Sequence, residues 1–409
     1  MDLPSDLTTG ERIKLIRESR GMTRPVLAGL CGRSPDWLKK IETGERELRS
    51  HSLLMRLAAA LRLDDLQLLT GGGVSVAAPV GGRLSHPSLP AIWEAVMARP
   101  LLWDLPATPP DPAALRTRVN DAWRLWHESD RNRTQVGARL PGLIRDTESA
   151  VRALEGDSRR TAYVALSDAY RLTGQATAYL APAELAWVVA DRALAAAQAS
   201  DDPSAIAAAA WSLGNILRTT AGTDEALAFV QDAASLLQPH LDGAPDHWRG
   251  VYGALRLHAA VTAARAGRAG DAWRFWDDGD RIAKSLPAAY VHPSTMFGRA
   301  NVDFHAISVA TDLSSRRQSL SLADQVDPDA IPSLERRSRL WVEIGRGHLQ
   351  RGDRTAALHV LQIAHGLNPE TVTFTPAART AVLDLWREAP RALRPEAGRL
   401  AEAVGVATA

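Results

Sequence analysis

Apolar residues recur along this chain at spacings of three and four residues, the period of an α-helix with one buried face. The spacing holds near the start, at Ile13 and Ile16, and far downstream, at Leu185 and Val188. Nothing alternates with period two over the length of a strand. Alanine-rich stretches such as 205–210 are typical of helices that pack closely. The pattern therefore predicts an all-α fold.

Glycine and proline divide the chain at one place. Residues 71–83 contain many breakers and no usable period, which is typical of a linker. We take the linker to cover residues 72–90 and to be flexible, so that the parts on either side are tethered but can reorient. The predicted organisation is an N-terminal domain of residues 1–71, this linker, and a helical domain of residues 91–409.

Capping signals predict five short helices in the N-terminal domain. Gly21 and Gly44 end the first and the third helix. Pro25 and Pro35 stand in the first turns of the second and third helices, where a missing N–H does no harm. The expected starts or caps are Glu11, Thr23, Ser34, Ser50 or Ser52, and Asp64 or Asp65.

Two motifs occur in this region, T-x-x-x-L-A from Thr23 and I-E-x-G-x-R from Ile41. With the predicted pair of short helices, they resemble the phage-repressor or Xre family of helix-turn-helix DNA-binding domains. The resemblance covers about residues 10–71. It implies that the third helix lies in the major groove with its N-terminal residues on the base edges.

The resemblance also implies which side chains face DNA. Asp36 repels phosphate unless it accepts from a cytosine amino group, and Trp37 packs either on a sugar or thymine methyl or on its own domain. The dipole at the start of the second helix favours a phosphate near Arg24. The expected groove-facing residues are Ser34, Pro35, Asp36, Trp37 and Lys40; the expected backbone contacts are Thr23, Arg24, Lys39, Arg46 and Arg49.

The charged residues indicate a binding partner only when they are counted by segment. The whole chain has 48 basic and 47 acidic residues, which favours no partner. From Glu11 to Ser50, however, the sequence has ten basic residues and six acidic ones, an excess suited to binding phosphate.

The single cysteine, Cys31, excludes an internal disulfide and is interpreted as a buried apolar residue in a reducing compartment. With no export signal or apolar span in the sequence, we expect a cytoplasmic protein.

The rest of the chain repeats a helix pair. In the clearest unit Gly345 precedes Leu361 and the unit closes at Pro369; a second unit places Gly214 before Val230. These spacings resemble the tetratricopeptide-repeat superfamily, which implies an α-solenoid of stacked helix pairs. The whole architecture resembles regulators of high-GC bacteria, and also quorum-sensing regulators that bind a peptide in a concave groove.

In such repeats the first helix of each pair lines the concave face. The register places Trp211, Asn215 and Arg218 there together; an Asn amide can pair with a peptide backbone, and Arg can hold a carboxylate. By a looser register, the neighbouring candidates are Arg171, Asn301 and Arg346. A packing or solvated role for any of these side chains stays open.

No nucleotide-binding loop, nucleophile elbow or zinc-protease motif occurs, so we expect neither an enzyme nor a bound metal or cofactor. The sequence predicts a DNA-binding transcription regulator that binds an inverted repeat as a homodimer and whose repeats sense a small molecule, a peptide or a protein partner. The alternative is a repeat scaffold that binds another protein and carries a vestigial DNA-binding domain.

Overall fold

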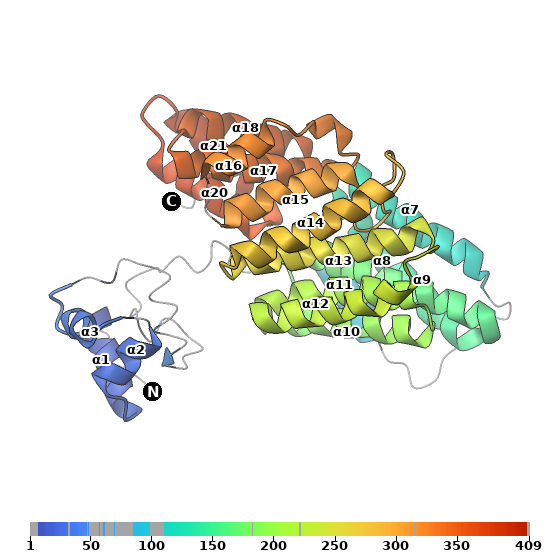
Figure 1. Ribbon diagram of the computed structural model, residues 1–409, viewed down its shortest axis with the longest axis horizontal. Helices are drawn as coiled ribbons and strands as arrows, with labels where there is room; N and C mark the ends of the chain where they lie inside the picture. The colour runs from blue at the N-terminus through green and yellow to red at the C-terminus, as the bar shows by residue number, and fades with distance from the viewer. Residues whose placement is uncertain are drawn as a thin grey trace. The chain divides into compact units, whose positions relative to one another are not determined.

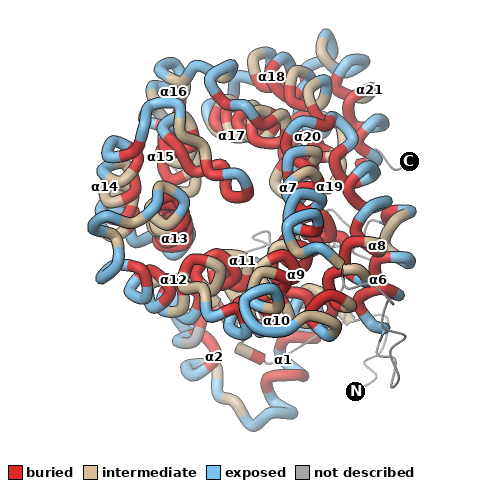
Figure 2. The backbone as a smooth tube through the Cα atoms, turned by 90° about the vertical axis from the view of Figure 1, so that its right-hand side faces the viewer, coloured by how far each residue is buried: buried red, intermediate tan, exposed pale blue. Residues whose placement is uncertain are grey.

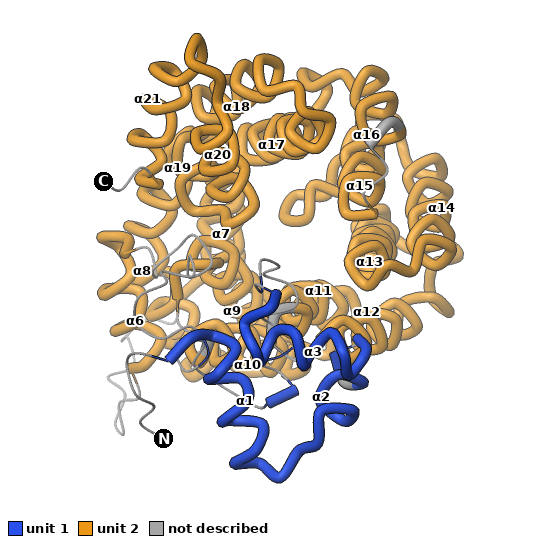
Figure 3. The backbone as a smooth tube through the Cα atoms, turned by 90° about the vertical axis from the view of Figure 1, so that its left-hand side faces the viewer, with its two compact units in different colours: residues 1–82 blue, residues 83–409 orange. Residues whose placement is uncertain are grey.

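The computed structural model describes residues 7–31, 33–46, 48, 57, 60, 61, 69, 85–98, 110–181, 183–220, 222–313 and 316–406. All regular secondary structure in these residues is helical, which confirms the predicted all-α class (Figure 1). The chain divides into two compact units, residues 1–82 and residues 83–409 (Figure 3). None of the described helices is long and apolar enough to cross a membrane.

The first unit contains α1 (Thr9–Ser19), α2 (Arg24–Leu30) and α3 (Pro35–Glu42), close to the first three predicted helices. α1 starts before the expected Glu11 because Thr8 and Glu11 form a capping box in which the Thr8 N–H donates to the Glu11 carboxylate at 2.9 Å. The predicted fourth and fifth helices lie outside the described residues apart from single positions. The apolar core of this unit contains Ile13, Ile16, Leu27, Ala28, Cys31, Trp37, Leu38, Ile41, Leu57, Leu61 and Leu69.

The second unit begins within the segment that the sequence assigns to a linker. Its first helix, α6, begins at Leu89, with Pro90 in the first turn, where proline suits a helix start. His86, just upstream, is buried. The helices of this unit follow one another along the chain, and many consecutive ones pack against each other as pairs. They are α6 (Leu89–Met97), α7 (Pro112–Glu128), α8 (Asn132–Ala153), α9 (Gly156–Thr177), α10 (Ala183–Ala199), α11 (Pro203–Thr220), α12 (Thr223–Leu237), α13 (Asp246–Arg265), α14 (Ala269–Ser285), α15 (Arg299–Asp312), α16 (Arg316–Ala323), α17 (Leu334–Arg351), α18 (Arg354–Leu367), α19 (Pro369–Phe374), α20 (Pro376–Glu388) and α21 (Arg394–Val404).

Small residues let the two helices of a pair approach closely, as the repeat pattern predicts. A Cβ added at Gly214 of α11 would lie 2.5 Å from a methyl carbon of Val230 in α12. One added at Gly345 of α17 would lie 2.9 Å from the Leu361 side chain in α18. Both distances are far inside ordinary van der Waals contact, so glycine is required by packing at these positions.

The helix pairs are arranged in two layers around a common centre (Figure 2). The inner layer consists of the first helices of the pairs, α7, α9, α11, α13, α15 and α17, and each contacts the next. α7 also contacts α17, so this inner layer closes on itself. The second unit is therefore a closed ring of helices, and its two ends meet beside α7.

Polar contacts of Glu370 and Asn368 join the ends of the ring. The Glu370 carboxylate in α19 accepts from the backbone N–H groups of Arg133, at 2.6 Å, and Thr134, at 3.2 Å, in the first turn of α8. The Asn368 side chain donates to the Ser129 carbonyl at 3.1 Å. A carboxylate at a helix start satisfies N–H groups that the helix cannot bond itself and interacts favourably with its dipole.

Glu370→Ala should loosen this closure. The change removes the acceptor for two backbone N–H groups at a helix start, so we expect a loss of about 1–2 kcal/mol in the free energy of unfolding. Urea unfolding followed by tryptophan fluorescence measures it, because every tryptophan except Trp37 lies in the second unit. Glu396→Ala, on the exposed face of α21, is the control; equal stability of both variants would contradict the assigned role.

Buried histidines make the second unit sensitive to acid. Burial lowers the pKa of His127 to about 4 and that of His292 to about 3. His127 contacts the Ser333 hydroxyl at 3.0 Å, a further link between α7 and the start of α17. Below their ordinary pKa of 6.5, both groups bind a proton in the unfolded chain but remain neutral in the folded one.

The free energy of unfolding should therefore fall as the pH drops from 6.5 toward 4.5, before most carboxylates titrate. We expect a slope of roughly 1 kcal/mol per pH unit for each of these histidines. Urea titrations across this range should show a shallower slope in His127→Gln and an unchanged one in His240→Gln, whose side chain is exposed. A flat pH profile in the native protein would rule out this account.

Candidate nucleic-acid interface

α2 and α3 are joined by a tight turn. The Arg33 N–H donates to the Ala28 carbonyl at 2.9 Å, which folds the chain back after α2. The Ser34 hydroxyl accepts from the Trp37 N–H at 3.2 Å and so caps α3, as predicted. Thr23 occupies the cap position of α2 without a side-chain capping bond. These local signals set where both helices begin.

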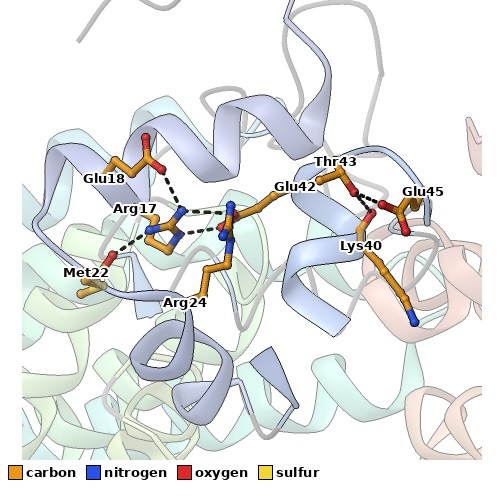
Figure 4. Close-up of polar contacts among 8 residues, drawn as sticks. All are labelled: Arg17, Glu18, Met22, Arg24, Lys40, Glu42, Thr43 and Glu45. Atoms are coloured by element: carbon orange, nitrogen blue, oxygen red, sulfur yellow. Dashed lines mark hydrogen bonds and ion pairs between the residues drawn. The ribbon is translucent and has the colours of Figure 1, made fainter. Parts of the chain in front are cut away.

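A buried carboxylate connects α1, α2 and α3 (Figure 4). Glu42, at the end of α3, has a side chain with no exposed surface. It accepts from Arg17 of α1 at 2.6 Å and 3.0 Å and from Arg24 of α2 at 2.7 Å. Burial raises the pKa of Glu42, but the bonds from Arg17 and Arg24 outweigh burial and lower it overall. The carboxylate therefore stays charged and fixes the angles among the helices.

Arg24 thus has a role that the sequence did not suggest. Its Nε–H is bonded to Glu42, while 37% of its side chain remains exposed. The expected contact with a phosphate would have to use the rest of the guanidinium group. Reversing the charge at this position would place a second carboxylate beside Glu42, so Arg24 is a poor site for testing DNA binding.

The outer face of α3 presents charged side chains to solvent. Asp36 and Lys40, one turn apart, form an ion pair at 2.8 Å, and both are exposed. Hydrogen bonding between them lowers the pKa of Asp36 and raises that of Lys40. Lys39 is also exposed, whereas Arg49 lies outside the described residues. The pair reduces the repulsion that Asp36 alone would exert on a phosphate.

An open recess of about 500 Å3 lies at the start of α3. Its lining combines two arginines with an aromatic ring: the Arg33 guanidinium lies 6.0 Å from the centre of the Trp37 ring. Trp37 itself is only 9% exposed and belongs to the core, which favours the interpretation that it packs on its own domain. We call this feature the α3 recess; it is lined by Gly29, Arg33, Ser34, Trp37 and Arg46.

Arg33 and Gly29 were missed among the candidate residues. Arg33 could have been found from the sequence, because it directly precedes the Ser34 cap of the helix expected to enter the groove. Gly29 carries no chemical signal and is identified only by its position on the recess.

Residues 9–69 match a family model described as a helix-turn-helix domain. The N-terminal unit carries a helix-turn-helix domain. No curated protein matches the chain. The matched residues include α1, α2 and α3.

Solved structures resemble the chain only weakly. BtubC from P. vanneervenii is 12% identical over 62% of this chain and 91% of its own, with a TM-score of 0.38. Bacillus thuringiensis PlcR, solved with the peptide PapR7 and DNA, is 12% identical over 89% and 99%, with a TM-score of 0.30. A point mutant of PrgX is 8% identical over 84% and 96%, with a TM-score of 0.35. These low scores establish nothing about what this chain binds.

Downstream of the helix-turn-helix domain, the structure brings three predicted ligand residues together on α11. The Arg218 guanidinium donates to the Asn215 side-chain oxygen at 2.8 Å. The Asn215 amide donates to the Trp211 carbonyl at 3.2 Å. Trp211 is half-buried, and its ring meets that of His258 in α13 edge-on, with 6.4 Å between their centres. These residues form a connected polar set on an inner helix.

The other three predicted ligand residues come from three different helices. Arg171 is 4% exposed and bonded to Asp168 at 2.5 Å and to Ser294 at 2.9 Å, so the protein already supplies its partners. Asn301 is 6% exposed, at the start of α15. Arg346, on α17, is held by Glu343 at 2.5 Å and by Asp312 at 3.3 Å.

Removing the Glu42 carboxylate should unfold the helix-turn-helix domain selectively. Glu42→Ala would remove the buried acceptor that Arg17 and Arg24 share and would leave the Arg17 guanidinium, which is 6% exposed, with only the Glu18 carboxylate and the Met22 carbonyl among the described residues. Losing one partner of a buried pair costs about 3–5 kcal/mol, a large share of the stability of a small domain. Hydrogen exchange followed by mass spectrometry should show faster exchange in residues 7–46 and unchanged exchange in the second unit. Glu45→Ala, at an exposed position, is the control, and protection of α1–α3 in Glu42→Ala would contradict the prediction.

Proposed function

We propose that this protein is a sequence-specific DNA-binding transcription regulator. Its helix-turn-helix domain binds DNA through α3, and its ring of helices senses a ligand or partner. The observation that carries the proposal is the α3 recess, where Arg33 and Arg46 lie beside the start of the recognition helix in a domain matched as helix-turn-helix. Arginine at this place can bind a phosphate or, in bidentate fashion, a guanine edge.

The other charged residues on α3 also support the proposal that this helix faces DNA. Lys39 and Lys40 are exposed on α3, and Asp36 is held by Lys40. When α3 enters a major groove, flanking lysines neutralise phosphates while the first turn of the helix approaches the bases. Arg24 contributes by holding Glu42, and so by holding α2 against α3.

The proposal includes a homodimer on an inverted repeat in a reducing, cytoplasmic setting. One recognition helix reads only a few base pairs, and a two-fold pair of domains doubles the length of the site. The second unit is the part of the chain large enough to hold two copies together without using α3. Its ring of inner helices also provides the surface on which an effector would act.

Arg33→Gln and Arg46→Gln should each weaken DNA binding by about fivefold to tenfold at roughly 0.1 M salt. Each change removes one exposed charge from the α3 recess, so the slope of log affinity against log salt should fall by about one. Fluorescence anisotropy with a duplex from upstream of the protein's own gene, against an unrelated duplex, measures both effects. Circular dichroism verifies that the variants are folded.

Arg281→Gln is the matched control, because Arg281 lies on the outer helix α14 and 76% of its side chain is exposed. It should bind DNA as the native protein does. Native protein that never distinguishes the upstream duplex from the unrelated one, even at low salt, would overturn the proposal. That result would favour a repeat scaffold with a vestigial DNA-binding domain.

A further inference from the structure

The segment that joins α14 to α15 turns into the ring instead of following its outer surface (Figure 2). Residues 294–298 are all buried, although connecting segments usually run over the surface of a protein. Side chains of this segment contact α9 and α13, which are not consecutive in the chain. We call residues 290–298 the strap, because they connect these two inner helices.

Two glycines of α13 make room for one part of the strap. A Cβ added at Gly253 would collide with the Phe297 ring, and one added at Gly250 would collide with the Tyr290 hydroxyl. The Phe297 side chain has no exposed surface. Since a larger residue at either position would push the strap away, α13 is closely fitted to it.

Backbone hydrogen bonds give the strap a shape of its own. The His292 N–H donates to the Phe297 carbonyl at 2.9 Å, and the Met296 N–H donates to the His292 carbonyl at 2.9 Å. The Thr295 hydroxyl accepts from the Phe297 N–H at 3.3 Å. Because these bonds lie within the strap, detaching it from a neighbouring helix does not unravel the turn.

The contact of the strap with α9 is a single polar side-chain bond. The Arg171 guanidinium of α9 donates to the Ser294 hydroxyl at 2.9 Å, and both side chains are buried. The same guanidinium lies 5.6 Å from the centre of the Trp123 ring in α7. Ser294 therefore attaches the strap to α9 and, through Arg171, places it close to α7.

This bond can break without leaving a buried charge unpaired. Arg171 also donates to the Asp168 carboxylate at 2.5 Å and lies 3.4 Å from the Ser212 hydroxyl. Losing Ser294 removes a neutral acceptor and leaves the ion pair with Asp168 in place, so the large cost of an isolated buried cation does not arise. The α9 end of the strap is therefore the end that releases more easily.

Two further features favour release at this end. Met296 has φ of +58°, a left-handed conformation that is costly for a residue other than glycine and persists only while its surroundings impose it. Pro293 is exposed, although His292 and Ser294 on either side of it are buried. Water therefore reaches the residue next to Ser294 and can replace the hydroxyl as the partner of Arg171.

We propose that the strap is a latch within the ring, which detaches from α9 at Ser294 while Phe297 stays packed on α13, and which uncovers the inner face of α9 around Arg171 when it opens. The ring then has two states that differ without the unfolding of any helix. A ligand that binds the uncovered face shifts the population toward the open state. This inference goes beyond the proposed function, since it concerns a movement of the ring and does not depend on DNA binding by α3.

Hydrogen exchange of the full-length protein in low concentrations of urea tests the latch. A local opening exposes little surface, so exchange in residues 290–298 should be faster than in α13 and nearly independent of urea. Ser294→Ala removes the acceptor of a charged donor and should speed exchange of the strap about tenfold, with α13 unchanged. Ser285→Ala is the matched control, because its exposed hydroxyl donates to the Ile282 carbonyl at 2.8 Å within α14.

Reaction with phenylglyoxal, which modifies accessible arginines, measures whether opening uncovers α9. Peptide mapping should show slow modification of Arg171 in the native protein and in Ser285→Ala, and modification about tenfold faster in Ser294→Ala. Exchange of the strap only together with α13, or equal reactivity of Arg171 in the native protein and Ser294→Ala, overturns the latch. Neither measurement involves DNA, so the latch can fail while the regulator survives, and the reverse.

Discussion

The Glu42 carboxylate, buried between Arg17 and Arg24, is the interaction on which the N-terminal unit depends. The apolar core of this unit is not directional, and apolar packing alone leaves the crossing angles of α1, α2 and α3 loosely defined. A charge removed from water must keep its donors in place, so the geometry of α1, α2 and α3 is fixed by the demands of one carboxylate. The α3 recess is lined by residues of both α2 and α3, so this constraint also bears on its shape.

The second unit uses the same principle at its own junction. In a stack of helix pairs each pair buries its apolar face against its neighbours, and such an array normally has two free ends. Here Glu370 binds the start of α8, and Asn368 binds the turn before it, so the ends meet. In both units a buried or half-buried acceptor fixes the relative position of segments that apolar contacts alone would not determine.

The sequence predicts the parts of this structure that depend on residues close together along the chain. Ser34 and Pro35 place the start of α3, Gly214 pairs with Val230, and the spacing of Asn215 and Arg218 puts them on one helix face. Contacts between distant segments have no local signature. The bond from Arg24 to Glu42 and the bonds of Glu370 to the start of α8 form only when the chain has folded. The sequence therefore suggested a phosphate as the ligand of Arg24, and near Glu370 it indicated only the proline that closes a repeat.

The closure of the ring is also connected with the charge of Arg133, in the first turn of α8. Burial lowers the pKa of Arg133; the neighbouring Arg339 lowers it further, and Glu335 and Glu370 raise it. Glu370 therefore acts at the junction in two ways, by its bonds to the first turn of α8 and by its attraction for the Arg133 charge. The carboxylate that closes the ring therefore also compensates a charge that the closed ring buries.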